Sequence, residues 1–289
     1  MAGMRAFPWP PVPPVELPPA RTVVAPDRGE LFLRDTGGDG PVVMLLHGWI
    51  ASGDLNWCAA YDDLRTAGYR VLAIDHRGHG RGLRQLQPFR LADCAADAAA
   101  ALRELGLAPA IIVGYSMGGA IGQLVARDQP DVVAGLVLSG TAQHWQDPQS
   151  RRYWRTMGAF GLMLKVAPLQ TWRWGFRRVG LPESERTAWL LSELQRHSAT
   201  DIAEAGRELG RFDSRPWLQP LDVPSAVVIT TKDDAVPPRK QRELAAALGA
   251  HEFEAPIRHI EIGASPERYN PALLEAIAAV RSANQTVAA

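Results

Sequence analysis

The chain has 289 residues, 46% of them hydrophobic, and its 31 basic and 31 acidic residues give a formal net charge of zero. A chain of this length can bury a large core, and its composition argues against disorder and fits one α/β domain with an insertion. The balanced charge leaves no basic footprint for nucleic acid, so we expect no nucleic-acid partner.

The cysteine content and the hydropathy of the chain indicate the cellular compartment we expect. Cys58 and Cys94 match neither a metal-ligand spacing nor a disulfide framework, so we expect reduced structural thiols in a cytoplasmic protein. No apolar run approaches the length of a membrane span, and we expect no integral membrane segment.

Residues 1–29 are predicted to form a Pro-rich N-terminal arm. Prolines at 8, 10, 11, 13, 14, 18 and 19 interrupt any apolar stretch that a signal peptide would need. We expect the arm to be an extended strap over the core or a disordered tail, and a Pro-rich ligand for a partner protein is the alternative.

From residue 30 onward, apolar runs alternate with helical patterns. The expected strands are 31–33, 42–46, 71–74, 110–113, 132–138, 226–230 and 251–254. The expected helices are 55–67, 91–105, 120–127, 239–248 and 266–280. This alternation predicts a mostly parallel, doubly wound sheet with helices on both faces, formed by residues 30–142 and 217–289.

The alternation breaks between residues 143 and 216, which we expect to form a helical cap, or lid. Tyr153, Met157 and Phe160 fall at helical spacing within it. We expect its apolar side chains to line a substrate pocket together with Tyr115, the cap residues being Trp145, Trp154, Met157 and Trp172. The alternative is that these side chains form the core of the cap itself.

The segment Gly114-Tyr115-Ser116-Met117-Gly118 joins the strand at 110–113 to the helix at 120–127. A buried strand, a Gly-x-Ser-x-Gly turn and a helix in this order resemble the nucleophile elbow of the α/β-hydrolase superfamily. Ser116 would occupy the tip of a strained turn, and Gly114 and Gly118 would supply the space that backbone crowding requires.

The resemblance covers residues 30 to 280. It implies the α/β-hydrolase sheet with a helical cap inserted after strand six, which is the strand at 132–138. The motifs look most like those of bacterial serine esterases and lipase-like hydrolases. Epoxide hydrolases and haloalkane dehalogenases carry Asp at the elbow, so Ser116 argues against both.

In this superfamily the triad runs in the order Ser, Asp or Glu, then His. The segment from Asp233 to Pro237 resembles the family's Asp-x-x-Val-Pro turn, which favours Asp233 as the acid over its neighbour Asp234. Two histidines compete for the base, His251 and His259. His251 begins the last strand and is at its wrong end, whereas His259 follows that strand, so the resemblance assigns the base to His259, although Arg258 replaces the usual preceding Gly.

The resemblance also implies an oxyanion hole. Its two backbone N–H donors would be Met117, which follows the nucleophile, and Trp49, which lies in a segment resembling the family's His-Gly-x motif. His47 in that motif is expected to be structural.

The segment Asp75-His76-Arg77-Gly78-His79-Gly80 resembles the family's Asp-x-x-Gly-x-Gly turn. Two histidines and an aspartate so close together are also compatible with a zinc site. The glycines favour a tight turn, and we expect no metal and no cofactor.

Together these features predict a serine hydrolase that cleaves a small carboxylic ester with an apolar acyl or aromatic group. Acyl transfer, perhydrolysis and C–C bond hydrolysis can use the same triad, and a hydrolase-like ligand-binding protein with little turnover is an alternative of another class. The sequence leaves open the natural substrate, acyl length, alcohol group and oligomeric state.

Overall fold

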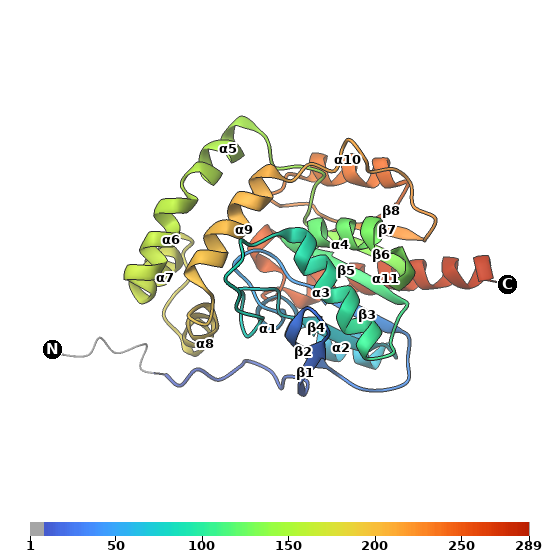
Figure 1. The fold of residues 1–289 in the computed structure, drawn as a ribbon, viewed down its shortest axis with the longest axis horizontal. Coiled ribbons are helices and arrows are strands. Elements are labelled where there is room, and N and C mark those ends of the chain that lie inside the picture. The colour runs from blue at the N-terminus through green and yellow to red at the C-terminus, as the bar shows by residue number, and fades with distance from the viewer. Residues whose placement is uncertain (1–8, 289) are drawn as a thin grey trace.

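The computed structural model describes residues 9–288. An eight-stranded sheet with the order β1-β2-β4-β3-β5-β6-β7-β8 forms its centre, and helices cover both faces (Figure 1). The strands are β1 Ala20–Ala25, β2 Gly29–Asp35, β3 Val42–Leu46, β4 Arg70–Ile74, β5 Ala110–Tyr115, β6 Val133–Ser139, β7 Ser225–Thr230 and β8 His251–Ala255. The strands from β3 to β8 pair in parallel, and β1 and β2 run antiparallel to their neighbours. The predicted fold class is therefore confirmed.

Helices cover both faces of the sheet, and successive side chains of a strand point to opposite faces. Each strand therefore contributes to two cores. Met44 and Leu46 of β3 join one core, whereas Val43 and Leu45 join the other. The helices of the first core are α3 Leu91–Glu104, α4 Met117–Asp128 and α10 Pro238–Leu248. Those of the second are α1 Gly53–Trp57, α2 Tyr61–Thr66 and α11 Pro266–Ala288. Two short 3-10 helices, η1 Pro130–Val132 and η2 His259–Glu261, complete the central part of the fold.

The N-terminal boundary differs from the sequence expectation. Residues 20–29 were predicted to belong to the arm, but β1 pairs with β2 in an antiparallel hairpin and buries Val23 and Ala25. The hairpin turn places Asp27 and Gly29 at positive φ, and Arg28 N–H donates to the carbonyl of Ala25. The prolines from which the arm was predicted also limit this strand. Because proline has no N–H to donate to a strand ladder, the strand cannot start earlier.

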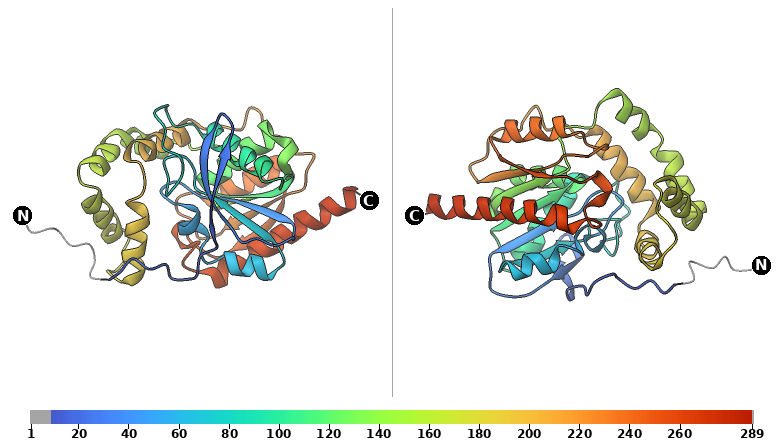
Figure 2. Two further views of the ribbon diagram at one scale, coloured as in Figure 1. Left: turned by 60° about the horizontal axis from the view of Figure 1, so that its bottom comes forward. Right: turned by 180° about the vertical axis from the view of Figure 1, so that it is seen from behind.

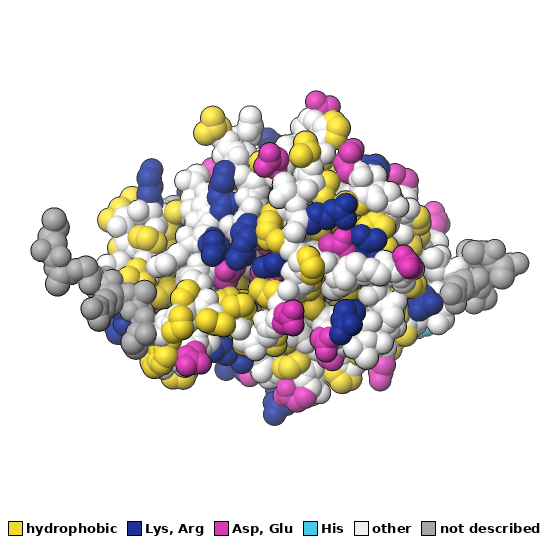
Figure 3. Space-filling model, turned by 90° about the horizontal axis from the view of Figure 1, so that it is seen from below, with side chains coloured by type: hydrophobic (Ala, Val, Ile, Leu, Met, Phe, Trp, Pro, Cys, Tyr) yellow, Lys and Arg dark blue, Asp and Glu magenta, His cyan; other side chains and the backbone are white. Residues whose placement is uncertain are grey.

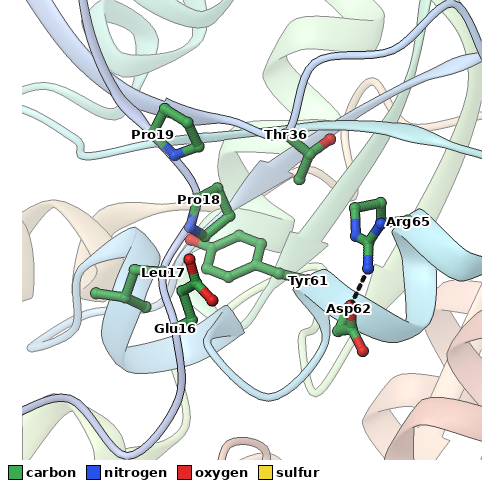
Figure 4. Close-up of a pocket in the computed structure, with 8 residues that line it drawn as sticks. All are labelled: Glu16, Leu17, Pro18, Pro19, Thr36, Tyr61, Asp62 and Arg65. Atoms are coloured by element: carbon green, nitrogen blue, oxygen red, sulfur yellow. Dashed lines mark hydrogen bonds and ion pairs between the residues drawn. The ribbon is translucent and has the colours of Figure 1, made fainter.

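Residues 9–19 form no helix or strand and run from the region below α8 to the start of β1 (Figure 1). Leu17 packs against the second core, and the carbonyl of Pro18 accepts a hydrogen bond from Arg34. Arm residues and α2 together line a surface pocket of about 260 Å³, in which the Tyr61 ring lies beside Leu17 and Pro18 while Arg65 and Asp62 pair with each other (Figure 4). Residues 1–8 of the predicted arm lie outside the described residues.

A second difference concerns the helix predicted at 55–67. The chain forms two short helices there, α1 and α2, and residues 58–60 make a turn in which Ala60 N–H donates to Trp57 O. The apolar pattern continues through this turn because Trp57, Tyr61 and Leu64 are all buried in the same core.

Five helices lie between β6 and β7 and form a layer beside the sheet (Figures 1 and 2). They are α5 Pro148–Arg155, α6 Met157–Val166, α7 Pro168–Arg178, α8 Glu185–Leu194 and α9 Ala199–Arg211. We call them the inserted helices. They have an apolar cluster of their own, built around Leu164, Trp172, Phe176, Leu191 and Ile202. No helix within residues 9–288 is both long and apolar enough to cross a membrane.

Candidate active site

The turn between β5 and α4 has the geometry expected of an elbow. Ser116 adopts φ +54° and ψ −116°, a conformation that a non-glycine residue rarely takes, and its N–H donates to Ser139 O at 2.9 Å. A Cβ atom on Gly114 would collide with the carbonyl oxygen of Gly118, and one on Gly118 would collide with the carbonyl oxygen of Leu46. Glycine at these two positions lets the strained turn fit between strand and helix.

Three side chains from separate loops meet at this turn. His259 Nε2 lies 3.0 Å from Ser116 Oγ, and His259 Nδ1 lies 2.7 Å from Asp233 Oδ2. The loops that supply them follow β5, β7 and β8, whose carboxyl ends lie at the same edge of the parallel sheet. The arrangement can pass a proton from the serine hydroxyl to the imidazole while the carboxylate holds the ring.

Asp233 is buried and fully hydrogen bonded. Its Oδ1 accepts from the amides of Ala235 and Val236, at 2.9 and 2.8 Å. Its Oδ2 accepts from the hydroxyl of Thr230 at 2.7 Å, as well as from His259. The two backbone donors fix which carboxylate oxygen faces the imidazole.

Asp234 points away from this cluster. Its carboxylate is exposed and makes an ion pair with the exposed Arg258, at 2.8 Å. The hydrogen bond from Arg258 lowers the pKa of Asp234. Of the two rival aspartates, only Asp233 contacts His259. His251, the rival histidine, lies exposed at the start of β8.

Tyr115 is placed differently from the sequence expectation. Its side chain is buried in the second core, where its ring contacts Trp57 and Tyr269, and not on the side of the inserted helices. Its hydroxyl donates to the carbonyl oxygen of His259 at 2.7 Å. Burial raises the pKa of Tyr115, so the hydroxyl remains a donor. Tyr115 therefore supports the His259 loop and does not line a pocket beneath the inserted helices.

The two predicted amide donors flank the serine. Met117 is the first residue of α4, where a helix leaves its N–H groups without intrahelical partners. Within residues 9–288, neither the Met117 nor the Trp49 amide donates a hydrogen bond to another group of the protein. Gly48 N–H is instead bonded to Asn56 Oδ1 at 2.6 Å, which holds the loop after β3 in place. Two free amides beside a nucleophile can stabilise a negative oxygen.

The Trp49 side chain connects this loop to the inserted helices. Its Nε1 donates to the carbonyl oxygen of Ile202 in α9 at 2.8 Å, and its ring meets Trp154 edge-on with centroids 5.4 Å apart. Met157 is buried beside it, since both side chains contact Gly206 of α9. Of these two predicted pocket residues, Trp154 therefore lies against Trp49, and Met157 lies close by at Gly206.

The other two predicted pocket residues lie elsewhere. Trp145 packs on Phe212 in the first core, with ring centroids 5.8 Å apart. Trp172 belongs to the separate cluster of the inserted helices and contacts Phe160. The alternative interpretation, that aromatic side chains build the core of the insertion, describes Trp172.

The turn from Asp75 to Gly80 holds the insertion on the core. Asp75 accepts from the amides of Gly53 and Arg81, both at 2.7 Å, and burial raises its pKa to about 6. Gly80 N–H donates to His197 Nδ1 at 2.8 Å, and Arg81 makes a bidentate ion pair with Glu193 of α8. These contacts make the turn a structural anchor between the inserted helices and the central part of the fold.

Four histidines cluster at this anchor: His76 and His79 belong to it, and His47 and the half-buried His197 pack against it. Burial lowers the pKa of His76 and His79 to about 3, and the pKa values of the other two well below the ordinary value, so all four are neutral at pH 7. His47 Nδ1 faces Gly48 O, and its Nε2 accepts from His76 N–H, which gives it a structural role in the loop after β3. Within the described part of the chain, no three His, Cys, Asp or Glu side chains converge as metal ligands do.

Two supporting residues were missed at the sequence level. Thr230 donates to Asp233, and Gln241 of α10 bonds to Thr230 at both its amide and its hydroxyl. Thr230 ends β7 next to the predicted acid, so its position carried a signal. Gln241 carried none, because its contact depends on how α10 packs on the sheet.

Comparisons with known proteins decide the family. A family model described as the alpha/beta hydrolase fold matches residues 41–259. The chain belongs to the α/β-hydrolase family. This α/β-hydrolase is 31% identical to a non-heme haloperoxidase from Rhodococcus erythropolis over 246 residues, which cover 78% of this chain and 86% of that protein. It is also 38% identical to a bifunctional esterase/perhydrolase from Acinetobacter calcoaceticus over 118 residues, 40% of this chain and 42% of that protein.

Solved structures share the fold of this α/β-hydrolase. A thermophilic esterase from Thermogutta terrifontis superposes with a TM-score of 0.74 at 22% identity, covering 91% of this chain and 99% of that chain.

Proposed function

We propose that this α/β-hydrolase cleaves a carboxylic ester through an acyl-enzyme on Ser116. The observation that supports the proposal is the continuous hydrogen-bonded path from Asp233 through His259 to Ser116, with contacts of 2.7 and 3.0 Å. The free amides of Trp49 and Met117 beside the serine supply the second requirement, a site for the oxyanion.

The proposed reaction begins when His259 Nε2 takes the proton of Ser116 Oγ, which attacks the ester carbonyl carbon. The carbonyl oxygen becomes negative and accepts hydrogen bonds from the Trp49 and Met117 amides. The protonated His259, held at Nδ1 by Asp233, gives its proton to the departing alcohol and leaves Ser116 acylated. Water then loses a proton to His259, attacks the acyl carbon and releases the acid, and the proton returns to Ser116.

The inserted helices would act as the cap that selects the acyl group. Trp154 packs against Trp49, whose amide is one of the proposed oxyanion donors, and Met157 lies close by at Gly206. An apolar environment beside the reacting carbonyl favours an apolar acyl or aromatic substrate of small size. A cytoplasmic location remains our expectation.

The decisive experiment replaces Ser116 by Ala and measures hydrolysis of p-nitrophenyl esters together with labelling by a fluorophosphonate. Wild type should turn over the ester and take up the label, and the variant should do neither. Ser192→Ala is the matched control, because Ser192 bonds only to its own helix carbonyl at Trp189 and should keep both properties. Turnover that survives in Ser116→Ala would overturn the proposal.

A second candidate is perhydrolysis, in which hydrogen peroxide replaces water and the acyl-enzyme is released as a peracid. It is favoured by the similarity to proteins named as a haloperoxidase and as an esterase/perhydrolase. The test is to supply acetate, hydrogen peroxide and bromide: the peracid would oxidise bromide to hypobromous acid, and bromination of phenol red by that acid is followed. A rate no higher in wild type than in Ser116→Ala would exclude this activity.

A further inference from the structure

The first inserted helices concentrate positive charge in a chain that is neutral overall. Residues 148–182 contain no Asp or Glu, and their seven basic residues are Arg151, Arg152, Arg155, Lys165, Arg173, Arg177 and Arg178. Many surface arginines elsewhere have acidic partners, as in the pairs Arg103–Asp131 and Arg242–Glu254. The charge on α5 to α7 is therefore segregated.

Most of these cations have no acidic partner among the described residues. Arg173 pairs with Glu183, but the other six are exposed, and none of them makes an ion pair with an acidic residue among residues 9–288. Cations that lack acidic partners and are gathered on neighbouring helices repel one another, so an anionic surface would stabilise them.

The same helices expose apolar side chains. Leu162 and Val166 of α6 are 62% and 75% exposed, and Trp174 of α7 is 56% exposed. Seven of the twelve exposed large hydrophobic residues of the described chain lie between residues 153 and 181, the others of this group being Tyr153, Met163, Val179 and Leu181. Figure 3 shows hydrophobic and basic side chains together at the end of the molecule formed by the inserted helices, at the left. Such a concentration marks an interaction surface.

The exposed apolar residues of α6 and α7 lie opposite the buried side of each helix. The inner side of the two helices buries Leu164, Trp172 and Phe176 against α8 and α9. Leu162 and Val166 are one helical turn apart on the opposite side of α6, and Trp174 is on the opposite side of α7 from Trp172 and Phe176. We call this surface the outer face of α6–α7.

The outer face is held in shape at the junction of its helices. The hydroxyl of Thr171 lies 2.8 Å from Ala167 O and 3.1 Å from Met163 O, so it bonds across the corner between α6 and α7. The guanidinium of Arg178 lies 5.4 Å from the centre of the Trp174 ring. An exposed indole under an arginine combines apolar and cationic contacts at one place.

We propose that the outer face of α6–α7 docks on the surface of an anionic lipid bilayer. Leu162, Val166 and Trp174 would enter the boundary between headgroups and acyl chains, while Lys165, Arg177 and Arg178 contact lipid phosphates. A nucleic acid would meet the cations but leave the leucine and valine in water. A second copy of the same face would bring like charges together, which opposes a symmetric dimer.

The test is sedimentation of the full chain with vesicles of phosphatidylcholine alone or of equal parts phosphatidylcholine and phosphatidylglycerol. We expect binding to the anionic vesicles that is at least tenfold tighter than to the neutral ones and that weakens with salt. Two double variants, Arg177→Glu/Arg178→Glu and Leu162→Ser/Val166→Ser, should each lose tenfold or more of this binding.

Two single-substitution controls make the same kinds of change away from the outer face. Arg239→Glu reverses an exposed cation on α10, and Leu86→Ser removes a fully exposed leucine from the loop before α3. Both controls should bind as wild type does, and all variants should keep the thermal unfolding midpoint within a few degrees.

Three results would overturn the proposal: equal binding to neutral and anionic vesicles, unchanged binding of both double variants, or a dimer in size-exclusion chromatography that the charge-reversal variant abolishes. Binding to DNA that competes with the vesicles and persists in Leu162→Ser/Val166→Ser would assign the face to nucleic acid instead. The measurement needs no substrate, so its outcome is independent of the ester hydrolysis proposed above.

Discussion

Replacing Asp233 by Asn should remove nearly all turnover while leaving the fold intact. The amides of Ala235 and Val236 donate to Oδ1 of Asp233. In the variant they would hold the side-chain oxygen of Asn at that place and direct its NH₂ group toward His259 Nδ1. The NH₂ group can only donate, so the imidazole would carry its proton on Nε2, the atom that faces Ser116 Oγ. A protonated Nε2 cannot accept the serine proton.

The size of the effect follows from this change of tautomer. A triad whose acid is replaced by its amide loses about 10⁴-fold in kcat. That loss corresponds to about 5.5 kcal/mol of transition-state stabilisation. Asp234→Asn is the matched control, because Asp234 and Arg258 are 64% and 53% exposed and such a pair contributes at most about 1 kcal/mol.

The assay is kcat/KM for p-nitrophenyl esters of both variants, with circular dichroism to verify folding. We expect Asp234→Asn to stay within about fivefold of wild type and Asp233→Asn to fall by about 10⁴-fold. The reasoning fails if Asp233→Asn keeps a tenth of the wild-type rate or more, or if the two variants lose similar amounts.

Three other predictions concern residues around this centre. Thr230→Val removes the hydroxyl that donates to Asp233, so kcat should drop roughly 10- to 100-fold with little change in KM. Thr230→Ser keeps a hydroxyl and should restore kcat. An unaltered kcat in Thr230→Val would contradict the supporting role of Thr230. Trp49→Phe deletes the bond to Ile202 O, which should lower the free energy of unfolding in urea by about 1 kcal/mol and change chain-length preference more than kcat; a kcat loss beyond 100-fold would count against it. The four histidines at the anchor have lower pKa values in the folded protein than histidine has in the unfolded chain. The unfolded chain therefore binds protons first as the pH falls, and the stability that is complete above about pH 6.5 is lost below it. His197→Asn, which can still accept from Gly80, should therefore reduce the slope of unfolding free energy against pH by up to about 1.4 kcal/mol per unit between about pH 4 and 6, and an unchanged slope would refute the assignment.

The elbow was predictable because its constraint is local. Gly114, Ser116 and Gly118 interact within one turn between a strand and a helix, so five residues of sequence are enough to specify the conformation. The alternation of strands and helices is local too, and it predicted the parallel sheet correctly. β1 escaped notice because proline dominates the residues before it, whereas its pairing depends on β2.

The catalytic roles remain proposals, but the residues assigned to them from sequence do lie together. Asp233 and His259 were placed by motif register, and the register alone could not state that Asp234 would turn outward to Arg258. Tyr115 was expected in the substrate pocket because it is the neighbour of the nucleophile. Side chains of β5 alternate between the two faces of the sheet, and this alternation directs Tyr115 into the second core, beneath His259.

The sequence by itself determined the sheet, the strained serine turn and the acid-free basic stretch at 148–182, since each depends on neighbouring residues or on composition. Only the tertiary structure decided which side chains of that stretch face outward. Leu164 and Trp172 are buried against α8 and α9, whereas Val166 and Trp174, of similar hydrophobicity, are exposed. Burial in a helix depends on which elements pack against it, and those partners lie tens of residues away along the chain.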